Sequence, residues 1–175
     1  FVLEVQEELS PLGAHHFLEL VADQFYTDIA LYRSVDNFLT QFGISENPDK
    51  KHWHMEQIQD DRNLHRGIKK YDISFAGGGP NTRSTQIFIA FADLDFLGKE
   101  PWETPFARVV SGFDTVDRFH RGYGDIAPFN KAGPDQQILF REGNGYIRKK
   151  FPKTDFIKEC RVLGHEAGAY ELIAD

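Results

Sequence analysis

The chain has 175 residues, of which 41% are hydrophobic and 27% charged, and this length and composition favour one globular domain with a well-buried core. The formal net charge of −7 at pH 7 gives nucleic acid no long-range attraction, so we expect no nucleic-acid partner. The lone cysteine, Cys160, excludes an internal disulfide framework, and no run approaches the ~18 apolar residues that a membrane span requires.

The chain begins with a predicted strand and a predicted helix. Apolar residues alternate with others over residues 1–5, which is the period of a strand with one strongly apolar face. Ser10 and Pro11 then indicate a helix start, with serine as N-cap and proline in the first helical position. Apolar residues recur from there at helical spacing, so we expect an amphipathic helix over residues 11 to about 25.

The remainder is predicted to consist mostly of short strands joined by loops. We expect strands over residues 29–32, 38–44, 71–76, 85–91, 106–110 and 156–163. Residues 45–70 lack sustained periodicity and read as loop, residues 113–120 as a short helix, and residues 125–152 as a long irregular stretch. Many short strands with two convincing helices favour a mainly β fold, a closed or nearly closed antiparallel barrel, over a βαβ fold.

Two stretches carry a pattern specific enough to compare with known families. The first is LYRSVDNFLTQFG at residues 31–43, and the second is ISFAGGGPNTRSTQIFIAF at residues 73–91, which holds a glycine-proline turn between two apolar runs. In this order and at this separation, the two stretches resemble the cyclophilins, the proline cis/trans isomerases. The matching groove positions are Arg33, Phe38, Gln41, Gln86 and Phe88.

The resemblance covers nearly the whole chain and implies a fold. It runs from residue 1 to about residue 162 and is closest to a branch with a Gln-Phe-Gly-Ile-Ser groove segment, here residues 41–45. The family has an eight-stranded antiparallel closed β-barrel capped by two α-helices. We therefore expect a cyclophilin-like domain over residues 1–163, followed by a C-terminal extension over residues 164–175 that serves as a linker or a docking tail.

The chemistry of prolyl isomerisation explains why these residue types matter. The barrier of ~18–20 kcal/mol is the amide resonance lost when the C–N bond twists, so the reaction needs no metal, cofactor, nucleophile or acid–base pair. A guanidinium can donate to the imide nitrogen lone pair that is exposed only in the twisted state. By the resemblance, Arg33, Phe38 and Gln41 are the catalytic residues.

The resemblance also assigns the residues that would bind substrate. Phe38, Leu39, Phe88 and Leu97 match the apolar proline pocket, although phenylalanine and leucine on strands are ordinarily core residues. The small residues at 76–78 match the stretch whose backbone pairs with an extended peptide. The expected substrate-binding set is Leu39, Ala76, Gly77, Gly78, Gln86, Phe88, Phe96, Leu97 and Trp102.

Several positions depart from the family pattern. Asp36 stands where a proline is common, and we expect its carboxylate to pair with Arg33 and compete for the guanidinium. Phe96 replaces a tryptophan linked to cyclosporin binding, so we expect cyclosporin binding to be weak. The segment of residues 98–104 is longer than its counterpart in the family, and no histidine matches the one that lines the groove there. We therefore expect Trp102 or Thr104 to line this wall of the groove.

The sequence therefore predicts a cofactor-independent peptidyl-prolyl cis/trans isomerase that acts on Xaa-Pro bonds in proteins and assists folding. The alternative is a proline-peptide-binding or scaffolding subunit of a larger assembly with little or no turnover. His52, His54 and His65 are too weak a pattern for zinc, so no metal site is predicted. The chain opens on Phe1 inside a strand pattern, so we expect that an upstream segment, either a targeting peptide or another domain, has been removed or left out; the compartment stays open.

Overall fold

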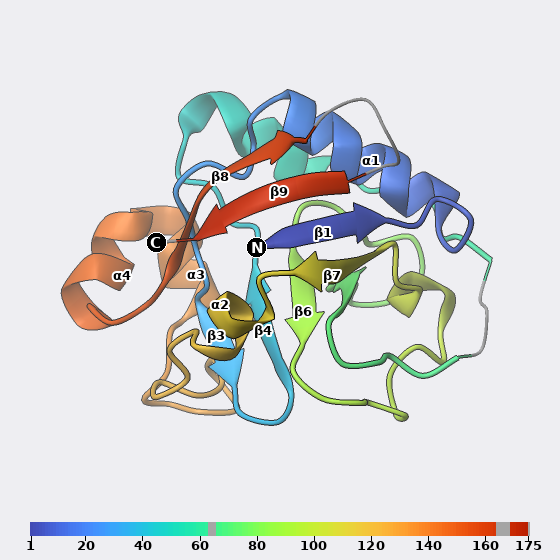
Figure 1. Ribbon diagram of the computed structural model, residues 1–175. Coiled ribbons are helices and arrows are strands. Elements are labelled where there is room, and N and C mark those ends of the chain that lie inside the picture. Colours follow the sequence, from blue (N-terminus) through green and yellow to red (C-terminus); the bar gives the residue numbers. More distant parts are fainter. Residues whose placement is uncertain (63–65, 164–168, 175) are drawn as a thin grey trace.

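The computed structural model describes residues 1–62, 66–163 and 169–174, and it contains nine antiparallel strands in one sheet. The strand order is β2-β8-β9-β1-β7-β5-β6-β4-β3; Figure 1 shows β8, β9, β1 and β7 following one another in this order. The strands are β1 Val2–Val5, β2 Ile29–Ala30, β3 Arg33–Val35, β4 Leu39–Phe42, β5 Asp72–Phe75, β6 Ile87–Ala90, β7 Ala107–Ser111, β8 Phe156–Val162 and β9 Ala169–Ala174.

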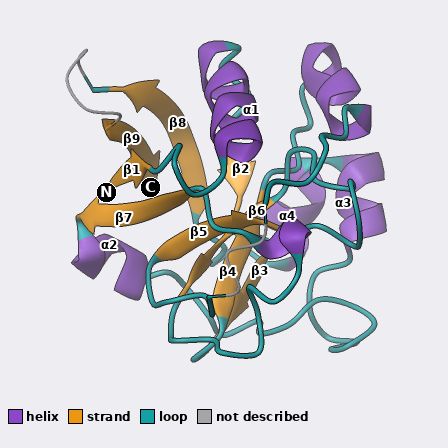
Figure 2. Cartoon of the chain, turned by 90° about the vertical axis from the view of Figure 1, so that its right-hand side faces the viewer, coloured by secondary structure: helices purple, strands orange, loops and turns teal. Residues whose placement is uncertain are grey.

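In the part of the chain that the structure describes, six helical segments accompany the sheet. They are α1 Pro11–Ala22, α2 Phe113–Asp117, α3 Gln136–Glu142, α4 Asn144–Lys150 and the 3₁₀ helices η1 Pro48–Met55 and η2 Pro101–Glu103. In Figure 2, α1 lies above the strands, while α3 and α4 lie on the side of the molecule away from β1 and β9. None of the helices within the described ranges is long and apolar enough to cross a membrane.

Helix α1 begins as the sequence predicts and ends three residues earlier than expected. Proline occupies its first turn, and its buried face includes Phe17 and Leu20. The helix stops because Gln24 adopts a left-handed backbone conformation, with φ of 54°. The amide of Phe25 then donates to the carbonyl of Leu20 at 2.8 Å, and the amide of Gln24 donates to the carbonyl of Val21 at 2.9 Å. This pair of hydrogen bonds is the Schellman motif that commonly ends a helix.

The main core lies between α1 and the sheet and is rich in aromatic rings. Phe17 of α1 stacks on Phe106 with ring centroids 5.0 Å apart, and Phe106 in turn lies 4.8 Å from Phe75 of β5. Leu3 of β1 and Ile73 of β5 are fully buried in the same cluster. The alternation in residues 1–5 thus predicted correctly which side chains of β1 enter the core.

The segment expected to be irregular, residues 125–152, contains α3 and α4, so that prediction was wrong. Asp135 caps α3, because its carboxylate accepts hydrogen bonds from the amides of Gln137 and Ile138. Each helix is only seven residues long and buries few apolar side chains, chiefly Leu139 and Ile147. Two turns give too few repeats for helical periodicity to stand out from the sequence.

Two other segments differ from expectation. Residues 45–70, predicted to be loop, include η1, whose residues are all at least partly exposed. The C-terminal segment expected to be a linker or docking tail includes β9, which pairs with β8 on one side and β1 on the other. The two outer strands of the sheet, β2 and β3, are separated in the chain only by Leu31 and Tyr32.

Candidate active site

A groove of about 310 Å³ opens on the part of the sheet formed by β3, β4 and β6. Nine of the twelve residues predicted for the site line this groove: Arg33, Phe38, Leu39, Gln41, Ala76, Gly77, Gln86, Phe88 and Leu97. Four further lining residues were not predicted: Phe75, Glu103, Ile126 and Gln136. The two sequence stretches that carried the prediction therefore meet in one concave site.

Strand register brings the polar residues of the groove together. Arg33 lies opposite Gln41 in the β3–β4 hairpin, and Gln41 lies opposite Phe88 in the β4–β6 ladder. Side chains of directly opposed residues project from the same face of a sheet. The hairpin turn passes through Asn37, whose φ of 54° is a left-handed conformation that asparagine tolerates well.

The apolar part of the groove is a small cluster at one side of the sheet. Leu39 and Phe88 are buried there, and Phe38 and Leu97 pack partly exposed against the same cluster. Phe96 does not line the groove but stacks on Phe38 with ring centroids 5.9 Å apart, and it is 67% exposed. These side chains form a slot whose floor is buried and whose rim is aromatic.

A chain of hydrogen bonds links the polar residues. Arg33 donates from Nη1 to Gln41 Oε1 at 3.0 Å, and Gln41 donates from Nε2 to Gln86 Oε1 at 3.1 Å. Gln86 Oε1 also accepts from the hydroxyl of Tyr32 and, at 3.1 Å, from Nε2 of Gln136. Burial raises the pKa of Tyr32, so its hydroxyl remains a donor at neutral pH. The network fixes the orientation of both glutamine amides.

The charge partner of Arg33 is Asp125, which the sequence analysis did not identify. Arg33 donates from Nε to Asp125 Oδ1 at 2.7 Å and from Nη2 to Oδ2 at 3.3 Å. The expected pairing of Arg33 with Asp36 is wrong, because Asp36 accepts from Nη1 of Arg121 at 2.9 Å. Asp36 lies just beyond the end of β3, in the turn of the hairpin, where its carboxylate meets Arg121 instead.

The three predicted residues that do not line the groove lie at or beyond its wall. The side chain of Trp102 packs against Gly77, where an added Cβ would lie 3.1 Å from Trp102 Cβ. Gly78 and Phe96 are absent from the lining. Thr104, the other residue considered for that wall, is buried, and its neighbour Glu103 lines the groove instead.

The histidines weighed as zinc ligands do not converge where the structure describes them. His54 lies with Nδ1 2.8 Å from Thr85 Oγ1, whereas His52 contacts the carbonyl of Asp49. His65 lies outside the described residues. Within residues 1–62, 66–163 and 169–174, no group of three His, Cys, Asp or Glu side chains is placed to hold a metal ion.

Comparison with solved structures identifies the fold. A cyclophilin-type peptidyl-prolyl cis-trans isomerase from Cryptosporidium parvum superposes with a TM-score of 0.53 at 21% sequence identity, over 66% of this chain and 74% of that one. A second structure of that protein, determined in the presence of the dipeptide Ala-Pro, gives a TM-score of 0.52 at 21% identity, over 66% of this chain and 75% of that one. The mainly β architecture with accompanying helices is therefore cyclophilin-like.

Similar sequences come from proteins named as peptidyl-prolyl cis-trans isomerase-like. The peptidyl-prolyl cis-trans isomerase-like 2 of Neurospora crassa is 33% identical over 95% of this chain, which spans 29% of that protein. The peptidyl-prolyl cis-trans isomerase-like 1 of Aspergillus fumigatus is 30% identical over 67% of this chain and 74% of that protein. The sequence profile described as cyclophilin type peptidyl-prolyl cis-trans isomerase/CLD matches residues 1–138. The chain therefore belongs to the cyclophilin-type peptidyl-prolyl cis-trans isomerase family.

Proposed function

We propose that the protein is a peptidyl-prolyl cis/trans isomerase that acts on Xaa-Pro bonds in proteins and so assists folding. The observation that carries this proposal is the position of Arg33 beside the apolar slot of Phe38, Leu39 and Phe88 in one groove. A proline ring fits an apolar slot, and the guanidinium then stands next to the bond that must twist. The family assignment supports the same activity.

The proposed mechanism stabilises the twisted amide more than the planar one. Phe38, Leu39, Phe88 and Leu97 hold the proline ring, while the acyl side of the bond rotates. As resonance is lost, the imide nitrogen gains a lone pair that can accept a hydrogen bond from Arg33. A hydrogen bond from a charged donor is worth roughly 1.5–3 kcal/mol, which corresponds to about one to two decades of rate.

The remaining groove residues are proposed to align the substrate backbone. Ala76, Gly77 and Gly78 follow β5 directly, and their small side chains allow an extended peptide to approach the main chain closely and pair with it as an added strand. Gln41 completes the catalytic group with Arg33 and Phe38 by bracing the guanidinium, and Gln86 contacts the peptide backbone. Trp102, packed on Gly77, and Phe96, stacked on Phe38, form the two outer walls.

A second candidate function is a proline-peptide-binding or scaffolding subunit of a larger assembly. Two observations favour it. The carboxylate of Asp125 neutralises Arg33, which reduces the field at the imide nitrogen. In addition, the chain spans only 29% of the Neurospora crassa relative, which leaves most of that protein outside this domain. Binding without turnover would use the same slot, and an NMR exchange measurement on an Xaa-Pro peptide separates the two functions.

We also propose that cyclosporin binds weakly. Phe96 stands at the rim in place of a tryptophan, and phenylalanine has no indole N–H to donate to a ligand carbonyl. Its ring is 67% exposed and packs against the ring of Phe38. Titration of the protein with cyclosporin, followed by tryptophan fluorescence, tests this affinity.

The finer architecture is likewise a proposal. We propose that the sheet closes into the eight-stranded barrel of the family, capped by helices, with residues 1–163 as the domain and residues 164–175 as an extension of it. The two ends of the sheet order, β2 and β3, are separated in the chain by only two residues, which supports closure. If β2 and β3 count as one strand, the sheet has eight strands, of which β9 comes from the extension. The pairing of β9 with β1 and β8 supports an extension that adds to the same sheet.

Isomerisation of a short Xaa-Pro peptide, measured by NMR exchange, tests the function. We expect the wild type to accelerate exchange and Arg33→Ala to lose at least tenfold in kcat/KM. Arg121→Ala is the matched control, because Arg121 lies over Phe91 and pairs with Asp36, outside the groove. A folded wild type that binds the peptide without acceleration would contradict the enzyme and favour the binding subunit.

A further inference from the structure

The guanidinium of Arg33 is held by a carboxylate from a part of the chain far from the two groove stretches. Asp125 is 92 residues away in sequence and engages the Nε–Nη2 edge of the guanidinium in two hydrogen bonds, at 2.7 and 3.3 Å. The two side chains are 16% and 26% exposed, so solvent competes only in part for this contact. A two-point contact of this kind fixes the plane of a guanidinium as well as its position.

Asp125 is itself held in place. Its Oδ1 accepts the backbone amide of Ile126 at 2.8 Å, which limits rotation of the carboxylate. The preceding Gly124 forms a bridge to Ser34, the residue next to Arg33 on β3, and the following Ile126 is buried against the second core cluster. The loop that carries Asp125 is thus anchored on both sides of the carboxylate, immediately beside the strand that carries Arg33.

The same loop covers the guanidinium from a second direction. Phe129, four residues after Asp125 and 75% exposed, has its ring centroid 6.0 Å from Arg33 Cζ. Phe38 of the groove lies 5.3 Å from the same atom. Arginine therefore meets a carboxylate at one edge, Gln41 at Nη1 and two aromatic rings at close range. These contacts leave N–H groups at the Nη end of the fork for a ligand.

We propose that Asp125 is the positioning residue of Arg33: it holds the guanidinium in the orientation from which the free N–H groups meet the imide nitrogen. This inference rests on the proposed isomerase function. The species to be stabilised is a neutral twisted amide, so the direction of the donated hydrogen bond matters more than the net charge behind it. A misplacement of about 1 Å is enough to cost a large factor in rate.

The test compares variants of Asp125 in the full chain. Asp125→Asn keeps the shape of the side chain and an oxygen for the Ile126 amide, but it replaces one acceptor with a donor and removes the charge. We expect kcat to fall about tenfold with KM within about twofold, because substrate binding through the apolar slot is retained. Asp125→Glu is expected to recover part of the loss, since it restores a two-point carboxylate. Asp36→Asn is the matched control, because it removes an exposed carboxylate of the same region that pairs with Arg121.

A second measurement does not depend on turnover. The Nε–H resonance of Arg33 is assigned by its loss in Arg33→Lys, and we expect it to be resolved and slow to exchange with water in the wild type. In Asp125→Asn it should move to the range of exposed arginines and exchange at least tenfold faster. Unchanged kcat together with an unchanged resonance would overturn the proposal. A wild type without isomerase activity would refute the proposed function, and the shift of this resonance would then decide whether Asp125 holds Arg33.

Discussion

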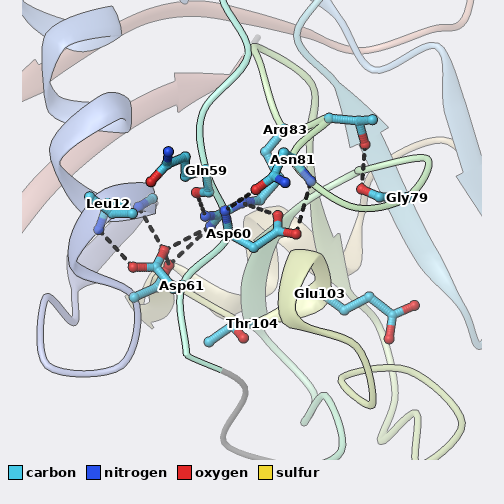
Figure 3. A network of polar contacts seen from close by, with 12 residues as sticks. Leu12, Gln59, Asp60, Asp61, Gly79, Asn81, Arg83, Glu103 and Thr104 are labelled. Atoms are coloured by element: carbon cyan, nitrogen blue, oxygen red, sulfur yellow. Dashed lines mark hydrogen bonds and ion pairs between the residues drawn. The ribbon is translucent and has the colours of Figure 1, made fainter.

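Arg83 and Asp61 form an ion pair that is sealed from solvent. Arg83 Nη1 lies 2.9 Å from Asp61 Oδ2, and the two side chains are 0% and 1% exposed (Figure 3). Asp61 also accepts from the hydroxyl of Ser10 at 2.5 Å and from the amide of Leu12 at 2.8 Å. The carboxylate of Asp61, 49 residues from Leu12 in sequence, therefore accepts hydrogen bonds from backbone amides in the first turn of α1. This is the role expected of Ser10 as the N-cap residue.

Replacing Arg83 with methionine is expected to destabilise the fold strongly. The substitution fills most of the volume but leaves Asp61 buried without its counter-charge, which costs about 3–5 kcal/mol of the free energy of unfolding. Urea denaturation followed by circular dichroism measures this loss. Arg148→Met is the control, because Arg148 pairs with Asp28 at 2.7 Å on the surface and such pairs contribute about 1 kcal/mol or less. Equal losses in the two variants would contradict the prediction.

The same ion pair predicts how acid affects stability. Burial alone would raise the pKa of Asp61, but hydrogen bonds from Ser10, the backbone amides of residues 12 and 13, and Arg83 outweigh it and hold the pKa below its ordinary value. A carboxylate with a lowered folded-state pKa stabilises the protein above the unfolded pKa of about 3.9, and this contribution is lost as pH falls through the folded value. Urea midpoints measured from pH 6 to pH 2.5 should fall less steeply below pH 4 in Asp61→Asn.

A second acid-sensitive group acts nearer to neutral pH. Burial lowers the pKa of His16 below 6.5, although its hydrogen bond to the carbonyl of Ser84 and the nearby Glu19 and Glu56 oppose this. The folded state therefore favours neutral histidine, and the unfolded state binds more protons as pH falls below about 6.5. The contribution of neutral His16 to stability should be present above the unfolded-state pKa of about 6.5 and should be lost as pH falls from there through the lower folded-state pKa.

His16→Gln isolates this contribution. Glutamine can still donate to the Ser84 carbonyl but does not titrate, so the slope of unfolding free energy against pH should flatten between pH 7 and pH 5. His15→Gln is the matched control, because the adjacent His15 has a side chain that is 75% exposed. A slope that stays the same in His16→Gln, or that changes equally in both variants, would count against the assignment.

Much of the fold was accessible from the sequence because local pattern and burial agree there. The alternation of residues 1–5 and the helical spacing after Pro11 each predicted an element that the structure contains. Short helices were missed because a seven-residue segment such as α3 is defined by its cap, Asp135, more than by periodicity. The strand β9 was missed because its partners, β1 and β8, are set by long-range pairing that no local pattern records.

In the site, too, residues within local sequence patterns were predicted, and residues brought in by long-range folding were missed. The residues on β3, β4 and β6 were predicted because they fall within two contiguous stretches of sequence. Asp125 and Gln136 were missed because they reach the groove from residues 124–136, a segment without a recognisable periodic pattern. For the same reason Asp36, near Arg33 in sequence, was chosen as its partner in place of Asp125. Sequence distance is a poor guide to charge pairing where a distant loop folds back on a hairpin.

Gly43 occupies a backbone position at the end of β4 that no other residue fits. Its φ is +113°, and an added Cβ would lie 2.2 Å from the carbonyl oxygen of Thr85. Gly43→Ala should therefore lower the free energy of unfolding by about 1–3 kcal/mol, because the backbone of one of the two segments must shift. Gly145→Ala in α4 is the control, since nothing lies within 4 Å of its added Cβ and alanine favours a helix by about 0.5–1 kcal/mol. Chemical denaturation of both variants measures the difference, and a loss in Gly145→Ala equal to that in Gly43→Ala would contradict the prediction.

The orientation of the Gln86 amide predicts which substrate group it binds. Its Oε1 accepts from Tyr32, Gln41 and Gln136, so its Nε2 is the atom presented as a donor to the groove. Gln86→Glu keeps an oxygen for these three donors but replaces Nε2 with a second acceptor, which would face a peptide carbonyl. We expect kcat/KM in the NMR exchange assay to fall about tenfold, since an unsatisfied hydrogen-bonding group costs about 1–3 kcal/mol. Gln137→Glu adds the same charge on the exposed face of α3 and should leave the rate within twofold; a Gln86→Glu protein as active as this control would mean that Gln86 does not donate to the substrate.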